Sequence, residues 1–182
     1  MIKIIALKDL DTWGLLKKNI DKFLSKDFDL EVVELIDKSI AYMTEELSTN
    51  LYENNLYRIV DYGHEFGHLI EIMTEFQLSH GEAVGIGMRL SNHIAYKNGH
   101  MNLTDYTDFN ELFKKLDLPY WHDSLSFQNL FAKRDSISRH KGGDFSIVAL
   151  HKIGDPYYIE TISMEDMKYA CNAMQTMAHE HD

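Results

Sequence analysis

Apolar side chains recur every three to four positions along most of this chain, which is the spacing of a helix with one buried face. Residues that favour helix starts interrupt the pattern, as does a stop signal at Asn98-Gly99. The pattern predicts helices over residues 2–8, from Asp11 or Thr12 to Leu24, from Asp29 to Leu47, over 56–75, from His80 to about Asn98, from Thr104 or Asp105 to before Leu118, from Asp123-Ser124 onward, and over 164–179. We therefore expect a mainly helical protein.

The period changes in one place near the C-terminal end. Residues Phe145 to Leu150 and Tyr157 to Thr161 are typical of two short strands, joined by a turn at Gly154-Asp155-Pro156. The string Ser163-Met164-Glu165-Asp166 then predicts a capping box for the last helix. No internal repeat or linker divides the sequence, so we expect a single helical domain over residues 1–182 with one small β-hairpin.

The overall charge and composition narrow the classes of partner. The net charge is −11 and no basic stripe is present, so we expect no nucleic-acid partner. No apolar run reaches the length of a bilayer span, which predicts no membrane segment. The single cysteine, Cys171, excludes an internal disulfide and favours a reducing compartment. Residues 1–9 have no signal-peptide pattern, and together these features predict a cytoplasmic protein.

Three histidines stand out as candidate metal ligands. His64 and His68 are four positions apart, so they share one face of a helix. His80 follows twelve positions later at the start of the next predicted helix, far enough for the chain to turn back. Imidazole is the commonest ligand of catalytic transition metals, and catalytic Zn²⁺ takes three protein ligands and one open position. The pattern therefore predicts a metal site that uses two or three of these side chains.

Two functions unrelated to each other fit part of this pattern. His64-Glu65-Phe66-Gly67-His68 is a literal H-E-x-x-H, in which both histidines bind Zn²⁺ and Glu65 activates water in a metallopeptidase. As a third ligand, Glu71 is too close on the same helix for the usual arrangement, whereas Glu82 is conceivable. A peptidase would leave the following histidine segment unexplained. The second function that fits part of the pattern is that of a metal-binding helical domain without catalytic activity.

A longer frame gives the sequence a specific resemblance. Gly63-His64-Glu65-Phe66-Gly67-His68, followed by His80-Gly81-Glu82-Ala83-Val84-Gly85-Ile86-Gly87-Met88, resembles the C-terminal domain of the dehydroquinate synthase-like sugar phosphate cyclases. The resemblance extends to Arg58 through Gly63 and to a short strand that ends in Ile153-Gly154. It covers nearly the whole chain, and the two histidine segments are its most specific parts.

The resemblance implies roles for four residues. His64 and His80 fall on the two metal-binding histidines of the family, and His68 falls on a substrate-contacting histidine close to the metal. The segment Met1-Ile2-Lys3 resembles the end of the family's Glu-Val-Ile-Lys segment, so Lys3 matches an active-site lysine. The family's third metal ligand, the glutamate of that segment, would fall just before residue 1. We therefore expect His64 and His80 as metal ligands, and His68 and Lys3 as catalytic residues.

Four further residues are candidates for substrate contacts: Arg58, Asp61, Arg139 and Lys141. This region departs from dehydroquinate synthase, because Asp61 stands where that enzyme has asparagine and Tyr57 where it has arginine. The reaction type is therefore better supported than the substrate. The form Asp-Tyr-Gly-His resembles the family branches that cyclise sedoheptulose 7-phosphate or glucose 6-phosphate.

The resemblance also implies cofactors and partners. Family members use NAD and Zn²⁺, or another divalent metal such as Co²⁺, to eliminate phosphate from a sugar phosphate and close a carbocycle. No glycine-rich dinucleotide fingerprint occurs here, so NAD is expected only together with a separate NAD-binding N-terminal half. We expect a homodimer, and we expect this chain alone to bind metal weakly and to be an incomplete enzyme.

Overall fold

A computed structural model describes residues 1–52, 54–134 and 146–180. Its elements are α1 (Ile2–Lys8), α2 (Leu10–Leu24), α3 (Leu30–Ser48), the 3₁₀ turn η1 (Ile59–Asp61), α4 (His64–Met73), α5 (His80–Lys97), α6 (Leu103–Lys115), α7 (Phe127–Lys133), β1 (Ile147–Lys152), β2 (Asp155–Ile159) and α9 (Met164–His179). The strands β1 and β2 pair antiparallel, with Ile147 opposite Ile159. The predicted fold class, mainly helical with one hairpin, is confirmed.

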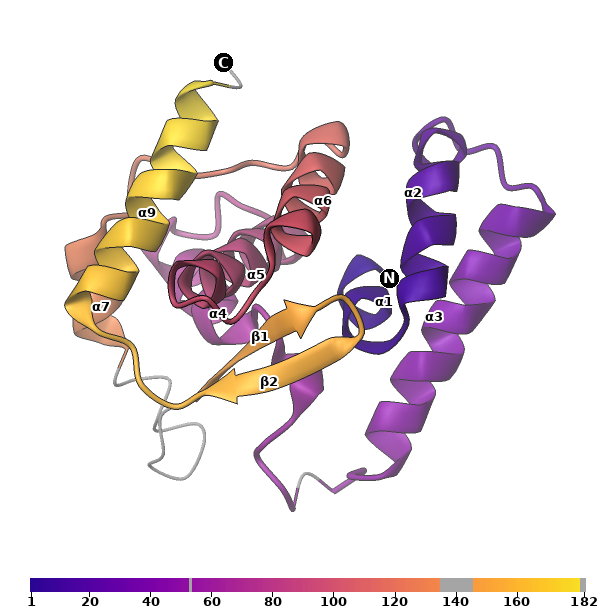
Figure 1. The fold of residues 1–182 in the computed structure, drawn as a ribbon, viewed down its shortest axis with the longest axis horizontal. Helices are drawn as coiled ribbons and strands as arrows, with labels where there is room; N and C mark the ends of the chain where they lie inside the picture. The colour runs from indigo at the N-terminus through magenta and orange to yellow at the C-terminus, as the bar shows by residue number, and fades with distance from the viewer. Residues whose placement is uncertain (53, 135–145, 181–182) are drawn as a thin grey trace.

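Helix α5 is the centre of the fold. Every residue from Ala83 to Ala95 is buried, as expected for a helix that neighbours surround on all sides. It packs against α4, α6, α9 and β1, whereas α1, α2 and α3 form a second group of helices beyond the hairpin (Figure 1). None of the helices in the described part of the chain is both long and apolar enough to cross a bilayer.

The core consists of two clusters of buried apolar side chains, and α5 contributes to both. Val84 and Met88 of α5 join the cluster that contains Trp13 from α2. Ile86 and Leu90, on the other side of α5, join the cluster formed with α4, α7 and α9. Burial of these side chains supplies the main stabilisation of the domain and fixes the position of α5. Residues at the first turn of α5 are thereby held against α4.

One predicted helix is interrupted in the structure. The sequence pattern indicated a continuous helix over residues 56–75, but only η1 and then α4 form, and α4 begins at His64. Gly63 lies between them with φ of +80°, a left-handed conformation that ends regular helix. Apolar periodicity does not reveal this break, because Val60 within η1 and Tyr62 directly after it are buried although neither belongs to α4.

Helix starts are placed by side-chain caps. Asp29 caps α3, and Ser163 with Asp166 forms the predicted capping box of α9. Three starts differ from prediction: Asp9 caps α2 and Asn102 caps α6, each earlier in the chain, and Ser126 caps α7 later. In each case several polar residues are adjacent, so the sequence pattern alone does not decide which of them caps the helix.

Candidate functional site

The three histidines lie together at the junction of α4 and α5. The ring centroids of His64 and His80 are 5.1 Å apart, those of His64 and His68 are 5.6 Å apart, and those of His68 and His80 are 6.0 Å apart. His64 and His68 occupy successive turns of α4, and His80 is the first residue of α5. The structure therefore brings together the three imidazoles that the sequence singled out.

A capping box fixes the start of α5 and with it the position of His80. The backbone N–H of Ser79 donates to Oε2 of Glu82 at 2.7 Å, and the Ser79 side chain caps the first turn in return. The sequence left Glu82 as a conceivable third metal ligand of a peptidase. In the structure its carboxylate accepts a hydrogen bond from this backbone group and stabilises the helix start.

Close packing of α4 against α5 depends on glycine. A Cβ placed on Gly87 of α5 would lie 2.1 Å from the carbonyl oxygen of Gly63 and 3.1 Å from the backbone nitrogen of Gly67. These contacts are with backbone atoms, which cannot rotate away as a side chain can. The glycine therefore permits the two helices to approach closely enough for their histidines to meet.

Glu71 is a member of the site that the sequence interpretation set aside. Its Oε2 lies 3.1 Å from Nδ1 of His68, and its Oε1 lies 3.0 Å from Nδ1 of His80. Burial acts to raise the pKa of Glu71, but hydrogen bonds from His80 and His68 outweigh it and lower the pKa. In the sequence, its position three residues after His68, on the same face of a helix, could have indicated that Glu71 belongs to the site. The contact with His80 requires the fold.

The protonation state of His64 suits a metal ligand. Burial, followed by the positive charge of Lys3, lowers the pKa of His64 to about 4. The imidazole is therefore neutral at physiological pH, the form that can donate a lone pair to a metal. Ligand atoms of His68, Glu71 and His80 also lie within 4.8 Å of one another. The donor set and its spacing fit a divalent metal such as Zn²⁺.

Lys3 reaches the site from α1. Its ammonium group donates to the carbonyl oxygen of Val60 at 2.6 Å. Burial lowers the pKa of Lys3 to about 8, even though the carboxylates of Asp61 and Glu65 act in the opposite direction. A lysine with such a pKa exchanges its proton near neutral pH. This property agrees with the catalytic role predicted for it, although the role itself stays a prediction.

We expect Lys3 to titrate near pH 8 in the folded protein, well below its ordinary value of 10.5. Because its pKa is lowered on folding, the unfolded chain binds more protons between these two values. The contribution of Lys3 to the free energy of unfolding therefore rises with pH across that window. NMR titration of the lysine Cε resonances, assigned by comparison with Lys3→Met, measures this pKa. A Lys3 resonance titrating near 10.5 would contradict the expectation.

Arg58 and Asp61 form an ion pair beside the site. The Nη2 and Nε atoms of Arg58 lie 2.9 Å and 3.2 Å from the two carboxylate oxygens of Asp61. Arg58 also lines a cavity of about 310 Å³ with Tyr57 and Tyr158. The pairing reduces the positive charge that Arg58 can offer to an anion. The other two predicted substrate contacts, Arg139 and Lys141, lie outside the described residues.

Glu65, the glutamate of the H-E-x-x-H string, is part of the interior. Its side chain is buried, with 7% exposed, and Oε1 accepts a hydrogen bond of 3.0 Å from the backbone N–H of Val148 in β1. The carboxylate thus connects α4 to the hairpin. The catalytic base of a peptidase must instead contact a metal-bound water. The inward orientation of Glu65 therefore favours the resemblance to the sugar phosphate cyclases over the metallopeptidase interpretation.

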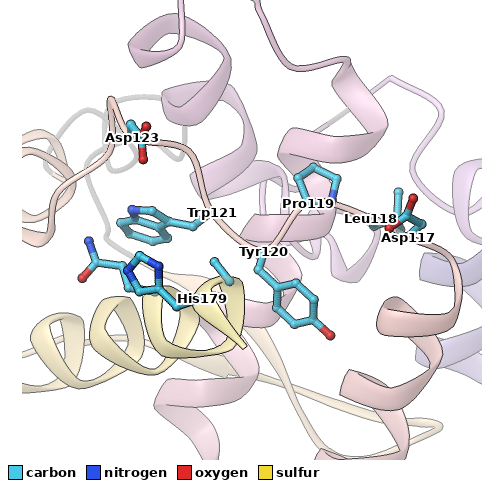
Figure 2. Close-up of a pocket in the computed structure, with 9 residues that line it drawn as sticks. Asp117, Leu118, Pro119, Tyr120, Trp121, Asp123 and His179 are labelled. Atoms are coloured by element: carbon cyan, nitrogen blue, oxygen red, sulfur yellow. The ribbon is translucent and has the colours of Figure 1, made fainter. Parts of the chain in front are cut away.

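A larger pocket lies elsewhere. It has a volume of about 380 Å³ and is lined by the loop between α6 and α7, including Tyr120 and Trp121, and by His179 of α9 (Figure 2). His64, His68 and His80 are not among its lining residues. Size alone therefore does not identify the functional site in this chain.

The helical fold and the three imidazoles at the junction of α4 and α5 define the class of protein: a candidate metal-binding domain. Its family follows from sequence: the family model for the 3-dehydroquinate synthase C-terminal domain matches residues 1–136. The chain belongs to this family. The two histidine segments that carried the resemblance both lie within the matched range.

The curated relatives that the chain matches are named as synthases. A 2-epi-5-epi-valiolone synthase from an Actinomyces species is 26% identical over 97% of this chain and 48% of its own length. A 3-dehydroquinate synthase from Dictyoglomus turgidum is 30% identical over 92% of this chain and 47% of its own length. The chain therefore spans about half the length of the curated relatives that it matches.

Solved structures agree on the fold. A 2-epi-5-epi-valiolone synthase from Streptomyces hygroscopicus, solved with NAD⁺ and Zn²⁺ bound, superposes with a TM-score of 0.91 at 24% identity, covering 97% of this chain and 49% of that one. A 2-deoxy-scyllo-inosose synthase, solved with carbaglucose-6-phosphate, NAD⁺ and Co²⁺, gives a TM-score of 0.56 at 23% identity over 70% of this chain and 36% of that one.

Proposed function

We propose that this chain is the metal- and substrate-binding half of an NAD-dependent sugar phosphate cyclase. The observation that carries the proposal is the meeting of His64, His68 and His80 at one helix junction in a chain of this family. The relatives and the solved neighbours are synthases of this kind, and the neighbours contain NAD⁺ with Zn²⁺ or Co²⁺.

His64 and His80 are the proposed metal ligands. Their rings are the closest of the three pairs, at 5.1 Å, and His64 is neutral at physiological pH because burial lowers its pKa. When bound, Zn²⁺ would supply Lewis-acid activation of neighbouring sugar hydroxyls. Two protein ligands are fewer than the usual three of a catalytic zinc site. A third ligand, which the resemblance gives as a glutamate, would complete the set.

His68 and Lys3 are the proposed catalytic side chains. The His68 side chain is 62% exposed, so one of its nitrogens can meet a substrate hydroxyl and exchange a proton with it. Lys3, with a pKa of about 8, can carry a positive charge toward an anionic group or accept a proton. Arg58 and Asp61, held as a pair, would contact the sugar. A carboxylate at position 61 disfavours a substrate carboxylate nearby, which favours a neutral sugar portion such as that of sedoheptulose 7-phosphate.

The proposal includes a second protein half. NAD⁺ carries the hydride in such reactions and would bind in that half. Ile72, one turn after His68 on α4, and Phe76, just beyond the end of α4, are largely exposed. Exposed apolar side chains beside a candidate site are typical of a surface that another domain covers. A homodimer of the complete assembly is part of the same proposal.

Phosphate release tests the proposed function. Sedoheptulose 7-phosphate and glucose 6-phosphate are incubated with NAD⁺, Zn²⁺ and this chain, first alone and then with a separately supplied NAD-binding half from a relative. We expect turnover only when both halves are present, and its loss in His64→Ala. Turnover by this chain alone would overturn the division of labour. Absence of turnover together with absence of Zn²⁺ binding would overturn the function.

Glu65→Gln separates the cyclase from the peptidase. Glutamine retains the oxygen that accepts from Val148, so the connection to β1 is kept while the negative charge is lost. Loss of the Glu65 charge also lowers the pKa of Lys3 further, so we expect cyclase turnover by the assembled halves to be retained, with its pH dependence shifted to lower pH. Cleavage of a casein substrate by the unchanged chain, abolished in Glu65→Gln at equal zinc content, would instead establish the peptidase.

A further inference from the structure

Glu71 lies between two histidines that belong to different helices. His68 precedes it by one turn on α4, whereas His80 begins α5. Each carboxylate oxygen lies within hydrogen-bond distance of a different imidazole, at 3.1 Å for His68 Nδ1 and 3.0 Å for His80 Nδ1. A single side chain thus contacts both the proposed metal ligand and the proposed catalytic histidine.

The chemistry of the three groups determines the direction of these hydrogen bonds. An ionised carboxylate has acceptors only, so each Nδ1 atom must carry the proton that is donated to Glu71. A neutral imidazole has one protonated nitrogen, so Nε2 of both His68 and His80 is then left with a free lone pair. At His80 that lone pair is what a metal ion requires, and at His68 it is what a proton acceptor requires.

Burial is consistent with a supporting position for the carboxylate. The Glu71 side chain is 15% exposed, whereas those of His68 and His80 are 62% and 56% exposed. The carboxylate therefore lies beneath the two rings, and the rings extend from it toward solvent. Outer-shell carboxylates that orient metal-bound histidines have this arrangement.

We propose that Glu71 is a positioning residue that holds His80 and His68 in the Nδ1–H tautomer, so that both Nε2 atoms face the reaction site. The metal-binding and proton-transfer consequences rest on the proposed function, whereas the tautomers themselves do not. Because one carboxylate serves both rings, rotation of its side chain would disturb both at once. Glu71 thus couples the metal ligand of α5 to the catalytic histidine of α4.

NMR on the 182-residue chain tests the tautomers directly. Long-range ¹H–¹⁵N correlation spectra, recorded without metal, distinguish Nδ1–H from Nε2–H imidazole. We expect Nδ1–H for His68 and His80 in the unchanged chain, and a shift of both toward Nε2–H in Glu71→Ala. Glu71→Gln is expected to shift only one ring, because an amide offers one acceptor and one donor group. Glu75→Ala, at an exposed glutamate of the same region, is the matched control.

Zn²⁺ affinity provides the second readout. By competition with a chromophoric chelator, we expect Glu71→Ala to weaken binding by about 10–100-fold, the usual effect of removing an outer-shell partner. Glu75→Ala should leave the affinity unchanged. Tautomers and affinity that are the same in Glu71→Ala as in this control would overturn the inference. A loss as large as that of His80→Ala, with altered Co²⁺ absorption, would also overturn it, because Glu71 would then be a direct ligand.

The two proposals fail in different ways. If His64→Ala and His80→Ala leave Zn²⁺ affinity unchanged while the tautomers shift in Glu71→Ala, the proposed function fails and the positioning geometry stands. If His80→Ala removes Zn²⁺ binding while Glu71→Ala changes neither tautomer nor affinity, the positioning role fails and the proposed function stands.

Discussion

The Gly87→Ala variant is expected to lose at least about 3 kcal/mol of its free energy of unfolding, the upper end of the usual cost of overpacking. The added methyl group would lie 2.1 Å from the Gly63 carbonyl oxygen and 3.0 Å from its carbon. Both are backbone atoms at the turn that precedes α4, so α4 and α5 must move apart. Separation of these helices would also move His64 away from His80, and Zn²⁺ affinity is expected to fall with stability.

Urea denaturation followed by circular dichroism measures this effect. Gly81→Ala is the matched control on the same helix, because nothing lies within 4 Å of a Cβ at Gly81. Alanine is favoured over glycine in helices by up to about 1 kcal/mol, so the control is expected to be neutral or slightly stabilised. Equal unfolding midpoints for the two variants would contradict the close approach of α4 and α5.

The second large effect is expected for the metal ligands. His80→Ala should lower the Zn²⁺ affinity of this chain by more than the about 10–100-fold loss typical of an outer-shell change. His68→Ala should lower it far less, because His68 is proposed to contact substrate and not metal. Comparison of the two variants is informative because both rings are exposed and both hydrogen-bond to Glu71. Each substitution therefore removes a similar amount of packing, and a difference in Zn²⁺ affinity reports on metal binding.

Competition with a chromophoric chelator, with Co²⁺ absorption as an independent signal, measures both affinities. His100→Ala serves as a control, since His100 is an exposed histidine just beyond the C-terminal end of α5, away from the three histidines at its start. A large loss in His68→Ala with little change in His80→Ala would favour the H-E-x-x-H pair, His64 with His68. That result would contradict the metal ligands proposed here.

The arrangement of the site supports the proposal that a second protein half acts together with this chain. His64 and His80 provide two of the three protein ligands usual for catalytic zinc. The side chains of His68 and His80 are more than half exposed, so water competes with substrate at both. Closure by a second domain would exclude this water and strengthen the electrostatic interactions within the site. The chain spans about half the length of the relatives that it matches.

The sequence by itself determined the helical class, the hairpin and the three histidines. Apolar periodicity and capping residues such as Asp29 and Ser163 depend on neighbours within one or two turns, so a linear pattern reveals them. The spacing of His64 and His68 placed both on one helical face for the same reason. The spacing left enough chain for His80 to turn back toward them, but only the family resemblance assigned it as a metal ligand, since the turn between the helices has no local signature for its direction.

The tertiary structure alone decided which polar groups meet across elements. Gly63 ends the predicted helix because its backbone lies against Gly87, a residue of the next helix. Glu71 reaches His80, and Glu65 turns inward to Val148, although their positions along α4 differ by less than two turns. Helix propensity is the same for these two glutamates, so the local sequence does not distinguish their partners. Their different partners follow from which face of α4 is covered, and packing of the whole core sets that face.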